Sequence, residues 1–317
     1  MMKVVRDLTE LERGRPAVLT IGAFDGVHRG HQFLIRQVIE RARRLAFDSV
    51  IISFDPRPDV VFRPDSRQLT DAGAKARIVG ALGPDVLAIL PFNRQVAQIS
   101  AGQFLVSILD HINLAEIWVG ADFAFGHNRE GDVDFLIRSG AAAGFAVHVV
   151  PRERLDETPI SSTLVRELVT AGDVTGAARY LGHYAGFSGP VVRGQGRGRA
   201  LGFPTANIHV PQYQALPATG IYAGYVRLGH ERLVSAASVG YNPQFEGHDL
   251  TVEAHILDFD RDIYGEELGI EFVQRVREER RFETVQALVD EMHRDIDCVR
   301  DILARAEEPG ELLLGSD

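Results

Sequence analysis

The residues best suited to chemistry lie between positions 20 and 31, which read TIGAFDGVHRGH. Three glycines in this stretch let the backbone bend and let a ligand approach with no Cβ in the way. His28 and His31 are three positions apart, so both imidazoles point the same way if they occupy the first turn of a helix. Together with the free N–H groups of a helix N-terminus, such a pair predicts an anion site, and a phosphate chain is the expected ligand.

The histidine pair has two other interpretations. It would be half of a zinc site, which needs a third ligand from a cysteine, a histidine or a carboxylate, or it would be ordinary surface polarity. The only cysteine, Cys298, lies far away in the sequence. The stretch also lacks the lysine of a P-loop, which argues against transfer of a γ-phosphoryl group at this turn. On the two histidines alone, the phosphate site and these alternatives carry equal weight.

A second candidate lies at residues 160–166, which read ISSTLVR. Hydroxyl side chains followed by an apolar stretch are typical of a helix N-cap, where Ser161 or Ser162 would satisfy free amides and still present a donor to a phosphate. Arg166 falls one turn inside that helix, and its guanidinium can bind two phosphate oxygens at once. A cap without any ligand is the commoner use of such residues.

Residues 193–202, RGQGRGRALG, form a glycine-rich loop that contains Arg193, Arg197 and Arg199. In an acidic chain this loop is either a phosphate-binding flap or the solvated tip of a hairpin. Its glycine spacing does not match the GxGxxG of dinucleotide-binding folds.

Two predicted strands that follow this loop in the sequence carry side chains with oxygen atoms. Thr205 and Asn207 are two apart, so a strand places the hydroxyl and the amide on one side, where they would serve as two neutral ligands of Mg²⁺. Glu253 shares one face of the alternating strand at 251–257 with His255. In each case the alternative is the ordinary polar face of a strand.

Strands and helices alternate through the first half of the chain. Apolar runs predict strands at residues 17–21, 49–54, 86–91, 117–120 and 146–150, and helical spacing predicts helices directly after residue 31 and at 75–82, 101–113 and 132–143. This order predicts an α/β fold with a doubly wound parallel sheet, which binds ligands at the carboxyl ends of its strands. The sequences FDPRP, residues 54–58, and ADFAFG, residues 121–126, follow two of these strands.

The character of the sequence changes between residues 171 and 186, where a short predicted helix at 173–181 ends in Gly182. Apolar runs then predict strands at residues 189–192, 206–210, 221–226, 234–239 and 251–257, which suit a small antiparallel β-barrel. An apolar stripe at helical spacing between 282 and 299 predicts a closing helix. We therefore expect an α/β domain at residues 1–184, a barrel domain at 185–308 and an acidic tail at 309–317.

The composition limits the class of protein. The chain has 317 residues and a formal net charge of −10, so we expect a globular protein with two cores and not a general nucleic-acid-binding protein. It contains no run of about eighteen apolar residues and no apolar signal core, which predicts neither a membrane span nor a secretion signal. A single cysteine fits a reducing, cytoplasmic compartment. The sequence does not indicate an oligomeric state.

Residues 22–31 follow the pattern GxFDGxHxGH, which resembles the signature of the nucleotidyltransferase superfamily in the form found in bacterial riboflavin kinase/FMN adenylyltransferases, the FAD synthetases. Residues 160–166 resemble the second ATP-binding motif of that family, and residues 202–207, GFPTAN, resemble the riboflavin kinase signature. The resemblance covers nearly the whole chain. It implies a bifunctional enzyme that phosphorylates riboflavin with ATP and Mg²⁺ to FMN, and then transfers an adenylyl group from a second ATP to FMN, which yields FAD and pyrophosphate.

The resemblance also implies roles for individual residues. In FAD formation, His28 and His31 would stabilise charge at the α-phosphorus, while Arg166 holds the leaving pyrophosphate. In FMN formation, Glu253 would deprotonate the 5′-hydroxyl of riboflavin. The expected ATP and phosphate contacts are Gly22, Phe24, Asp25, Gly30, Ser161, Ser162, Thr163, Arg193, Gly196, Arg197 and Arg199. The expected flavin contacts are Pro56, Pro58, Asp122, Phe123, Phe125, Asn242, Arg277 and Phe282, and the expected Mg²⁺ ligands are Thr205 and Asn207.

The chain departs from the family pattern at Ala23, Asp122, Pro159, Tyr241 and Gln244. These departures leave both histidines, the hydroxyl run and Arg166 in place. Two alternatives stay open: a nucleotidyltransferase for another small phosphate ester with a regulatory C-terminal domain, and a flavin-binding sensor without turnover. GFPTAN and Glu253 argue against the first alternative, and the histidines, Arg166 and Glu253 argue against the second.

Overall fold

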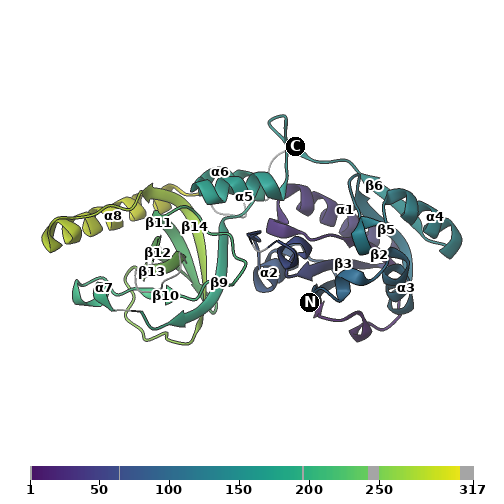
Figure 1. Ribbon diagram of the computed structural model, residues 1–317, viewed down its shortest axis with the longest axis horizontal. Coiled ribbons are helices and arrows are strands. Elements are labelled where there is room, and N and C mark those ends of the chain that lie inside the picture. The colour runs from purple at the N-terminus through teal and green to yellow at the C-terminus, as the bar shows by residue number, and fades with distance from the viewer. Residues whose placement is uncertain (1, 64, 195, 242–249, 308–317) are drawn as a thin grey trace. The chain divides into compact units, whose positions relative to one another are not determined.

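The computed structural model describes residues 2–63, 65–194, 196–241 and 250–307. Within these ranges, no helix is long and apolar enough to cross a membrane. The chain divides into two compact units, Met1–Ser161 and Ser162–Asp317, and each unit has hydrophobic cores of its own (Figure 1).

The first unit is built on a six-stranded parallel sheet. Its strands are β1 (Lys3–Val5), β2 (Ala17–Ile21), β3 (Asp48–Asp55), β4 (Val86–Pro91), β5 (Leu114–Gly120) and β6 (Ala146–Val150), in the order β1-β4-β3-β2-β5-β6. The chain proceeds from β2 to β3 and β4 on one side and then crosses to β5 and β6 on the other. The carboxyl ends of β2 and β5 therefore meet at the topological switch point, where folds of this kind bind ligands.

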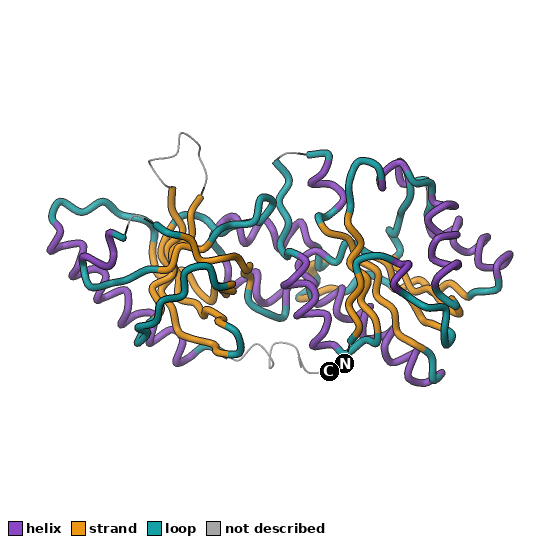
Figure 2. The backbone as a smooth tube through the Cα atoms, turned by 90° about the horizontal axis from the view of Figure 1, so that it is seen from below, coloured by secondary structure: helices purple, strands orange, loops and turns teal. Residues whose placement is uncertain are grey.

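Helices cover both faces of this sheet (Figures 1 and 2). The helices α1 (Arg29–Leu45) and α2 (Ala72–Leu82) pack on one face, and α3 (Ala101–His111) and α4 (Val133–Ala143) pack on the other. Successive strand residues alternate between the two cores: Val18 belongs to the core with α1, and Leu19 belongs to the core with α3. The predicted doubly wound α/β fold is confirmed.

Polar caps determine where these helices begin. His28, Asp71, Ser100 and Asp132 each accept a hydrogen bond from a backbone N–H group in the first turn of α1, α2, α3 and α4, respectively. Because Asp71 is the cap, α2 begins three residues earlier than predicted, and Lys75 lies in its first turns. A small hairpin of β7 (Arg154–Leu155) and β8 (Thr158–Pro159) follows the sheet.

The second unit contains α5 (Ser162–Ala171), α6 (Val174–Leu181), α7 (Arg197–Ala200), α8 (Val285–Arg305) and a closed barrel. The barrel strands are β9 (Ala185–Val192), β10 (Ala206–Ile208), β11 (Gly220–Leu228), β12 (Glu231–Tyr241), β13 (Leu250–Ile256) and β14 (Glu267–Arg277). They follow the order β10-β13-β12-β11-β14-β9 with antiparallel neighbours, and β10 closes the ring by pairing with β9. The predicted small antiparallel barrel is confirmed.

The strand β14 is a correction to the five predicted barrel strands. It pairs with β11 on one side and β9 on the other, so the barrel cannot close without it. Leu268, Ile270 and Phe272 alternate along β14 and fill the barrel core. This alternation was the available signal in the sequence.

The terminal helix packs on the outside of the barrel. Val299 and Leu303 of α8 share a core with Ala223 of β11, while hydrogen bonds between strands close the barrel itself. The helix begins at Val285, so Phe282, which was predicted to start its apolar stripe, lies before it.

Helices α5 and α6 belong to the second unit by packing. Val174 of α6 joins the barrel core, and Ala178 joins the core beneath α8. The predicted domain division after residue 184 follows the sequence motifs instead, and it stays a prediction.

Candidate functional site

The turn after β2 carries the sequence FDGVHRGH on a tightly bent backbone. Phe24, Gly26 and Val27 have φ angles of 44°, 77° and 39°, which is a strained conformation for the two residues with large side chains. A Cβ at Gly22 would lie 2.9 Å from the ring of Phe24, so a larger residue there would displace this buried ring. The turn brings His28 to the N-terminus of α1, and strain of this kind concentrates at functional sites.

His28 and His31 meet as their spacing predicts. Their rings stack with centroids 3.5 Å apart and planes inclined by 16°. The Nδ1 atom of His28 accepts the backbone N–H of His31 at 3.3 Å and thereby caps α1. The ring of Phe24 meets His31 edge-on at 5.2 Å, and a Cβ at Gly30 would lie 3.4 Å from the ring of His28. Two imidazoles therefore stand side by side at a helix N-terminus, where anions are favoured.

Burial and nearby positive charge keep His31 neutral. Its Nδ1 atom is enclosed and has no hydrogen-bond partner among the described residues. Burial lowers the pKa of His31 well below the usual 6.5, and the charges of His28 and Lys75 lower it further. At neutral pH, His31 can therefore bind phosphate oxygens as an uncharged hydrogen-bond donor.

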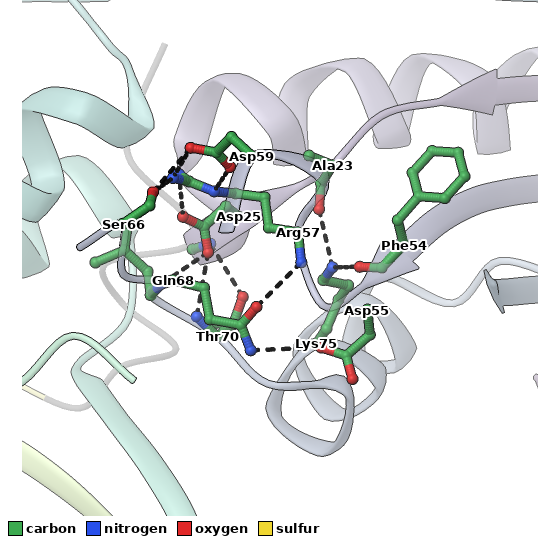
Figure 3. A network of polar contacts seen from close by, with 12 residues as sticks. Ala23, Asp25, Phe54, Asp55, Arg57, Asp59, Ser66, Gln68, Thr70 and Lys75 are labelled. Atoms are coloured by element: carbon green, nitrogen blue, oxygen red, sulfur yellow. Dashed lines mark hydrogen bonds and ion pairs between the residues drawn. The ribbon is translucent and has the colours of Figure 1, made fainter. Parts of the chain in front are cut away.

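A buried polar network surrounds Asp25 in the same turn (Figure 3). Its carboxylate accepts hydrogen bonds from the N–H groups of Leu69 and Thr70 at 2.7 and 3.3 Å, and from Nη1 of Arg57 at 3.0 Å. Burial raises the pKa of Asp25, and the charge of Arg57 opposes this rise. Asp25 thus ties the turn after β2 to the loop after β3, and its predicted contact with phosphate stays a prediction.

The loop after β3 carries Pro56 and Pro58, two of the predicted flavin contacts. Pro58 begins a short 3₁₀ helix. Between the prolines, Arg57 binds both Asp25 and Asp59. These ion pairs fix the loop at the carboxyl end of β3, which is where the fold predicts ligand contacts.

The carboxyl end of β5 adds aromatic residues. Phe123 and Phe125 stack with ring centroids 5.4 Å apart, and both pack against the same core as Phe54 of β3. Asp122 is exposed and forms an ion pair with Arg152 at 2.6 Å, and the hydrogen bond from Arg152 lowers the pKa of Asp122. The aromatic pair follows the carboxyl end of β5 and contributes to the core, and its flavin contact stays a prediction.

Sequence reasoning missed the residues that fasten the loop of Phe125. Glu130 accepts the backbone N–H of Ala101, at the start of α3, at 2.8 Å. A Cβ at Gly126 would lie 2.5 Å from the backbone nitrogen of Ala101, and one at Gly131 would lie 2.7 Å from the ring of Phe125. The two glycines around the loop were the only local signal, because the partner segment is distant in sequence.

Residues 160–166 span the division between the units. Ser161 is the last residue of the first unit, and α5 begins at Ser162, which agrees with the predicted helix start. Thr163 and Arg166 follow within α5. Their predicted contacts with pyrophosphate stay predictions.

The barrel brings predicted catalytic and metal-binding residues together. The hydroxyl of Thr205 donates to Oε2 of Glu253 at 2.9 Å. Asn207 of β10 lies opposite Glu253 of β13 in the antiparallel register, so the two side chains share one face. A hydroxyl, an amide and a carboxylate therefore gather at one place, and oxygen ligands of this kind suit Mg²⁺.

The glycine-rich loop packs against this group. A Cβ at Gly194 would lie 2.3 Å from Nδ2 of Asn207, so the backbone passes close to the amide. The guanidinium of Arg193 lies 5.0 Å from the ring centroid of Tyr264. Gly196, with a φ of 67°, is the N-cap of α7, so part of the predicted loop is helical.

A pocket of about 340 Å³ adjoins Thr205. Its wall includes Arg199 from the predicted phosphate contacts, and Phe259, Arg261 and Tyr264 from the loop after β13. The volume and the mixture of apolar and charged groups are typical of a small-molecule site. Sequence reasoning missed the loop after β13, although its dense mixture of aromatic and charged residues was a signal.

Arg277, a predicted flavin contact at the end of β14, binds α8. Its Nε and Nη2 atoms donate to the buried carboxylate of Asp295 at 2.8 and 2.7 Å. The ring of Phe282 lies 5.8 Å from the same guanidinium. This ion pair anchors the terminal helix, and the flavin contacts of both residues stay predictions. Asn242, another predicted flavin contact, and the variant position Gln244 lie outside the described residues.

The described ranges contain no group of three His, Cys, Asp or Glu side chains that could hold a metal ion. The zinc interpretation of the histidine pair therefore finds no third ligand in this part of the chain.

Comparisons with known proteins match both halves of the chain. Residues 11–164 match the family model described as FAD synthetase, and residues 181–303 match the model described as riboflavin kinase. A bifunctional riboflavin kinase/FMN adenylyltransferase from Pseudomonas fluorescens is 37% identical over 96% of this chain and 98% of its own. One from Listeria monocytogenes is 34% identical over 92% and 94%. A crystal structure described as a macrolide-efflux protein from Streptococcus pneumoniae is similar in fold, with a TM-score of 0.82 and 29% identity over 94% of this chain and 98% of that one.

Proposed function

The chain belongs to the family of bifunctional riboflavin kinase/FMN adenylyltransferases, and from this premise we propose how its residues carry out the two reactions. The enzyme phosphorylates riboflavin with ATP to give FMN. It also transfers the adenylyl group of a second ATP to FMN, which gives FAD and pyrophosphate. We propose the cytoplasm as its location, which a single cysteine fits.

FAD formation is assigned to the turn after β2. A phosphate oxygen of FMN attacks the α-phosphorus of ATP, and the bond from that phosphorus to the pyrophosphate oxygen breaks. The stacked His28 and His31 at the N-terminus of α1 stabilise the charge that develops on the phosphate oxygens. Arg166 and the hydroxyl run from Ser161 to Thr163 hold the departing pyrophosphate.

FMN formation is assigned to Thr205, Asn207 and Glu253. The observation that carries this assignment is the hydrogen bond from the Thr205 hydroxyl to Glu253 at 2.9 Å. Glu253 orients and deprotonates the 5′-hydroxyl of riboflavin, which then attacks the γ-phosphorus of ATP.

Thr205 and Asn207 are also the proposed ligands of Mg²⁺, and their neutral oxygens suit this ion. Because the Thr205 hydroxyl donates its hydrogen bond to Glu253, the lone pairs of its oxygen can face a metal ion. Asn207 would supply a second neutral oxygen, and waters and ATP phosphates would supply the remaining ligands. Mg²⁺, when bound, supplies positive charge to the phosphate oxygens.

The pocket beside Thr205 is the proposed site of the ATP of the kinase reaction. Phe259 and Tyr264 offer apolar surface for a base, and Arg199 offers a cation for phosphates. Arg193, which lies over Tyr264, extends this positive charge to the edge of the pocket.

The test is to incubate the purified protein with riboflavin, ATP and Mg²⁺ and to separate the flavins over time. We expect FMN first and FAD afterwards. FMN alone would contradict the assignment of FAD formation to the histidine site. The departures at Asp122 and Pro159 would then be the first explanation to test for the loss of adenylyl transfer. Flavin binding without any product would indicate a sensor, and adenylylation of a different phosphate ester would indicate the regulatory alternative.

A further inference from the structure

Lys75 is a buried charged side chain, which is unfavourable in free energy, and neither proposed reaction gives it a role. Two of the 34 lysine and arginine residues of the chain are lysines, Lys3 and Lys75. Lys75 lies in the first turns of α2, and its exposed fraction is 2%. A buried ammonium loses its hydration, and a cation near a helix N-terminus opposes the helix dipole. A lysine at such a place in an arginine-rich chain indicates a specific task.

The ammonium of Lys75 joins the two loops that lead to the FAD-forming site (Figure 3). Its Nζ atom donates to the carbonyl oxygen of Ala23 at 2.9 Å and to that of Phe54 at 2.7 Å. Ala23 begins the turn that leads to His28, and Phe54 precedes the loop with Pro56. One charged donor on α2 therefore ties the carboxyl ends of β2 and β3 together.

Charged groups from the turn after β2, from the end of β3 and the loop after it, and from the N-cap of α2 act on this ammonium. Asp25, Asp55 and Asp71 favour its charged form, Arg57 disfavours it, and burial is the largest effect, which lowers the pKa of Lys75 to about 8. Lys75 therefore carries a positive charge at neutral pH.

The field of this charge extends to the histidine pair. The positive charge of Lys75 is one of the three causes that lower the pKa of His31, with burial and His28. The same charge that ties the loops thus acts on a group assigned to the α-phosphate.

We propose that Lys75 is a positioning residue for adenylyl transfer, which holds the histidine turn against the loop after β3 and adds positive potential at the phosphate site. Lysine suits this task better than arginine, because its donors radiate from one compact centre and reach two carbonyl oxygens at once. The inference rests on the roles proposed for His28 and His31.

The decisive variant is Lys75→Met, which keeps the apolar stem and removes the charge and the donors. We expect kcat for FAD formation from supplied FMN to fall about 100-fold, the usual cost of a slightly misplaced reacting group, with little change in KM. FMN formation in the second unit should continue at the wild-type rate. Lys3→Met is the matched control, since Lys3 is exposed and donates to the carbonyl of Glu10; it should leave both rates unchanged.

Two further readouts separate positioning from loss of folding. Trp118, the only tryptophan, lies on β5 in the first unit, so its fluorescence reports whether that unit is folded. In Lys75→Met the pKa of His31, followed by NMR and assigned with His31→Asn, should rise, because a positive charge that lowers it is gone.

A wild-type measurement covers the case in which Lys75→Met does not fold. With lysine side chains labelled by ¹³C, the two lysines give two signals, which Lys3→Met assigns. Adding ATP should raise the pKa of Lys75, because phosphate charge favours the ammonium.

Three results would overturn the inference: an unchanged kcat in folded Lys75→Met, a His31 pKa that does not move in that variant, or a Lys75 signal indifferent to ATP. If the wild-type protein forms no FAD at all, the proposed function fails, while both NMR measurements still test Lys75.

Discussion

Replacing Glu253 with glutamine should remove most FMN formation while the barrel stays folded. The substitution keeps the size of the side chain and its ability to accept the Thr205 hydroxyl, which lies 2.9 Å away. It removes the negative charge that takes up the proton of the riboflavin 5′-hydroxyl. Glu253 is half-buried on β13. Glutamine is neutral, so the substitution leaves no unpaired charge in the barrel.

The size of the effect follows from these two interactions. Loss of a positioned general base lowers a rate by about 10²- to 10⁴-fold, which is about 2.7–5.4 kcal/mol of activation free energy at about 1.36 kcal/mol per factor of ten. The retained hydrogen bond from Thr205 is worth about 0.5–1.5 kcal/mol and cannot offset this loss. We therefore expect Glu253→Gln to keep no more than about 1% of the wild-type kcat.

The assay measures FMN formation from riboflavin and, in parallel, FAD formation from supplied FMN. The second rate should be unchanged, because that reaction is assigned to the histidine site of the first unit. A Glu253→Gln enzyme that keeps more than about a tenth of the wild-type rate would refute the role of Glu253 as the base. A loss of less than about tenfold is smaller than the smallest effect expected of a general base.

Thr205 provides a matched pair of variants for the metal. Thr205→Ser keeps the hydroxyl, whereas Thr205→Val keeps the shape and removes it. If the hydroxyl is a Mg²⁺ ligand, Thr205→Val should require more Mg²⁺ for half-maximal FMN formation, and Thr205→Ser should not. An equal Mg²⁺ requirement in both variants would contradict the metal assignment.

Three more predictions concern other parts of the two sites. His28→Asn combined with His31→Asn should stop FAD formation and spare FMN formation, and a double variant that forms FAD at the wild-type rate would contradict the adenylyl-transfer site. Gly194→Ala should raise KM for ATP in FMN formation, because the new Cβ would lie 2.3 Å from Nδ2 of Asn207; an unchanged KM would show that the loop does not shape the site. The folded-state pKa of His31 lies well below 6.5. Below about pH 6.5 the unfolded chain takes up a proton at this residue that the folded chain does not. The stability that His31 contributes is therefore present above about pH 6.5 and is lost as the pH falls below it. Unfolding followed by Trp118 fluorescence should show this loss of stability in the wild-type protein, and a smaller loss in His31→Asn. Equal pH profiles of stability in the two proteins would refute the neutral state of His31.

Local spacing was sufficient for several features of the sites. A separation of three residues predicted that His28 and His31 would meet, and they stack at 3.5 Å, because helix geometry alone brings such positions together. The alternation of strands and helices predicted the parallel sheet, since that order admits few other topologies. A separation of two predicted that Thr205 and Asn207 would share a face of one strand, whereas β10 begins at Ala206 and Thr205 lies just before it.

Features that depend on strand order and on distant partners were not predictable in this way. The strand β14 was missed although its residues alternate, because its place between β11 and β9 is a property of the closed barrel. The motif predicts a phosphate contact for Asp25, which stays a prediction, but no local pattern indicated that its carboxylate meets Arg57 and the amides of Leu69 and Thr70. No pattern in the sequence singled out Lys75.

The sequence by itself determined which chemical groups the chain carries, most of the elements that hold them and the family to which the motifs point. The tertiary structure alone decided which of these groups touch: Thr205 meets Glu253 across 48 positions, and Lys75 reaches Ala23 across 52. The reason is physical. Residue type and short-range spacing follow from local backbone geometry, whereas a contact between distant residues exists only after the strands have paired in one order and register.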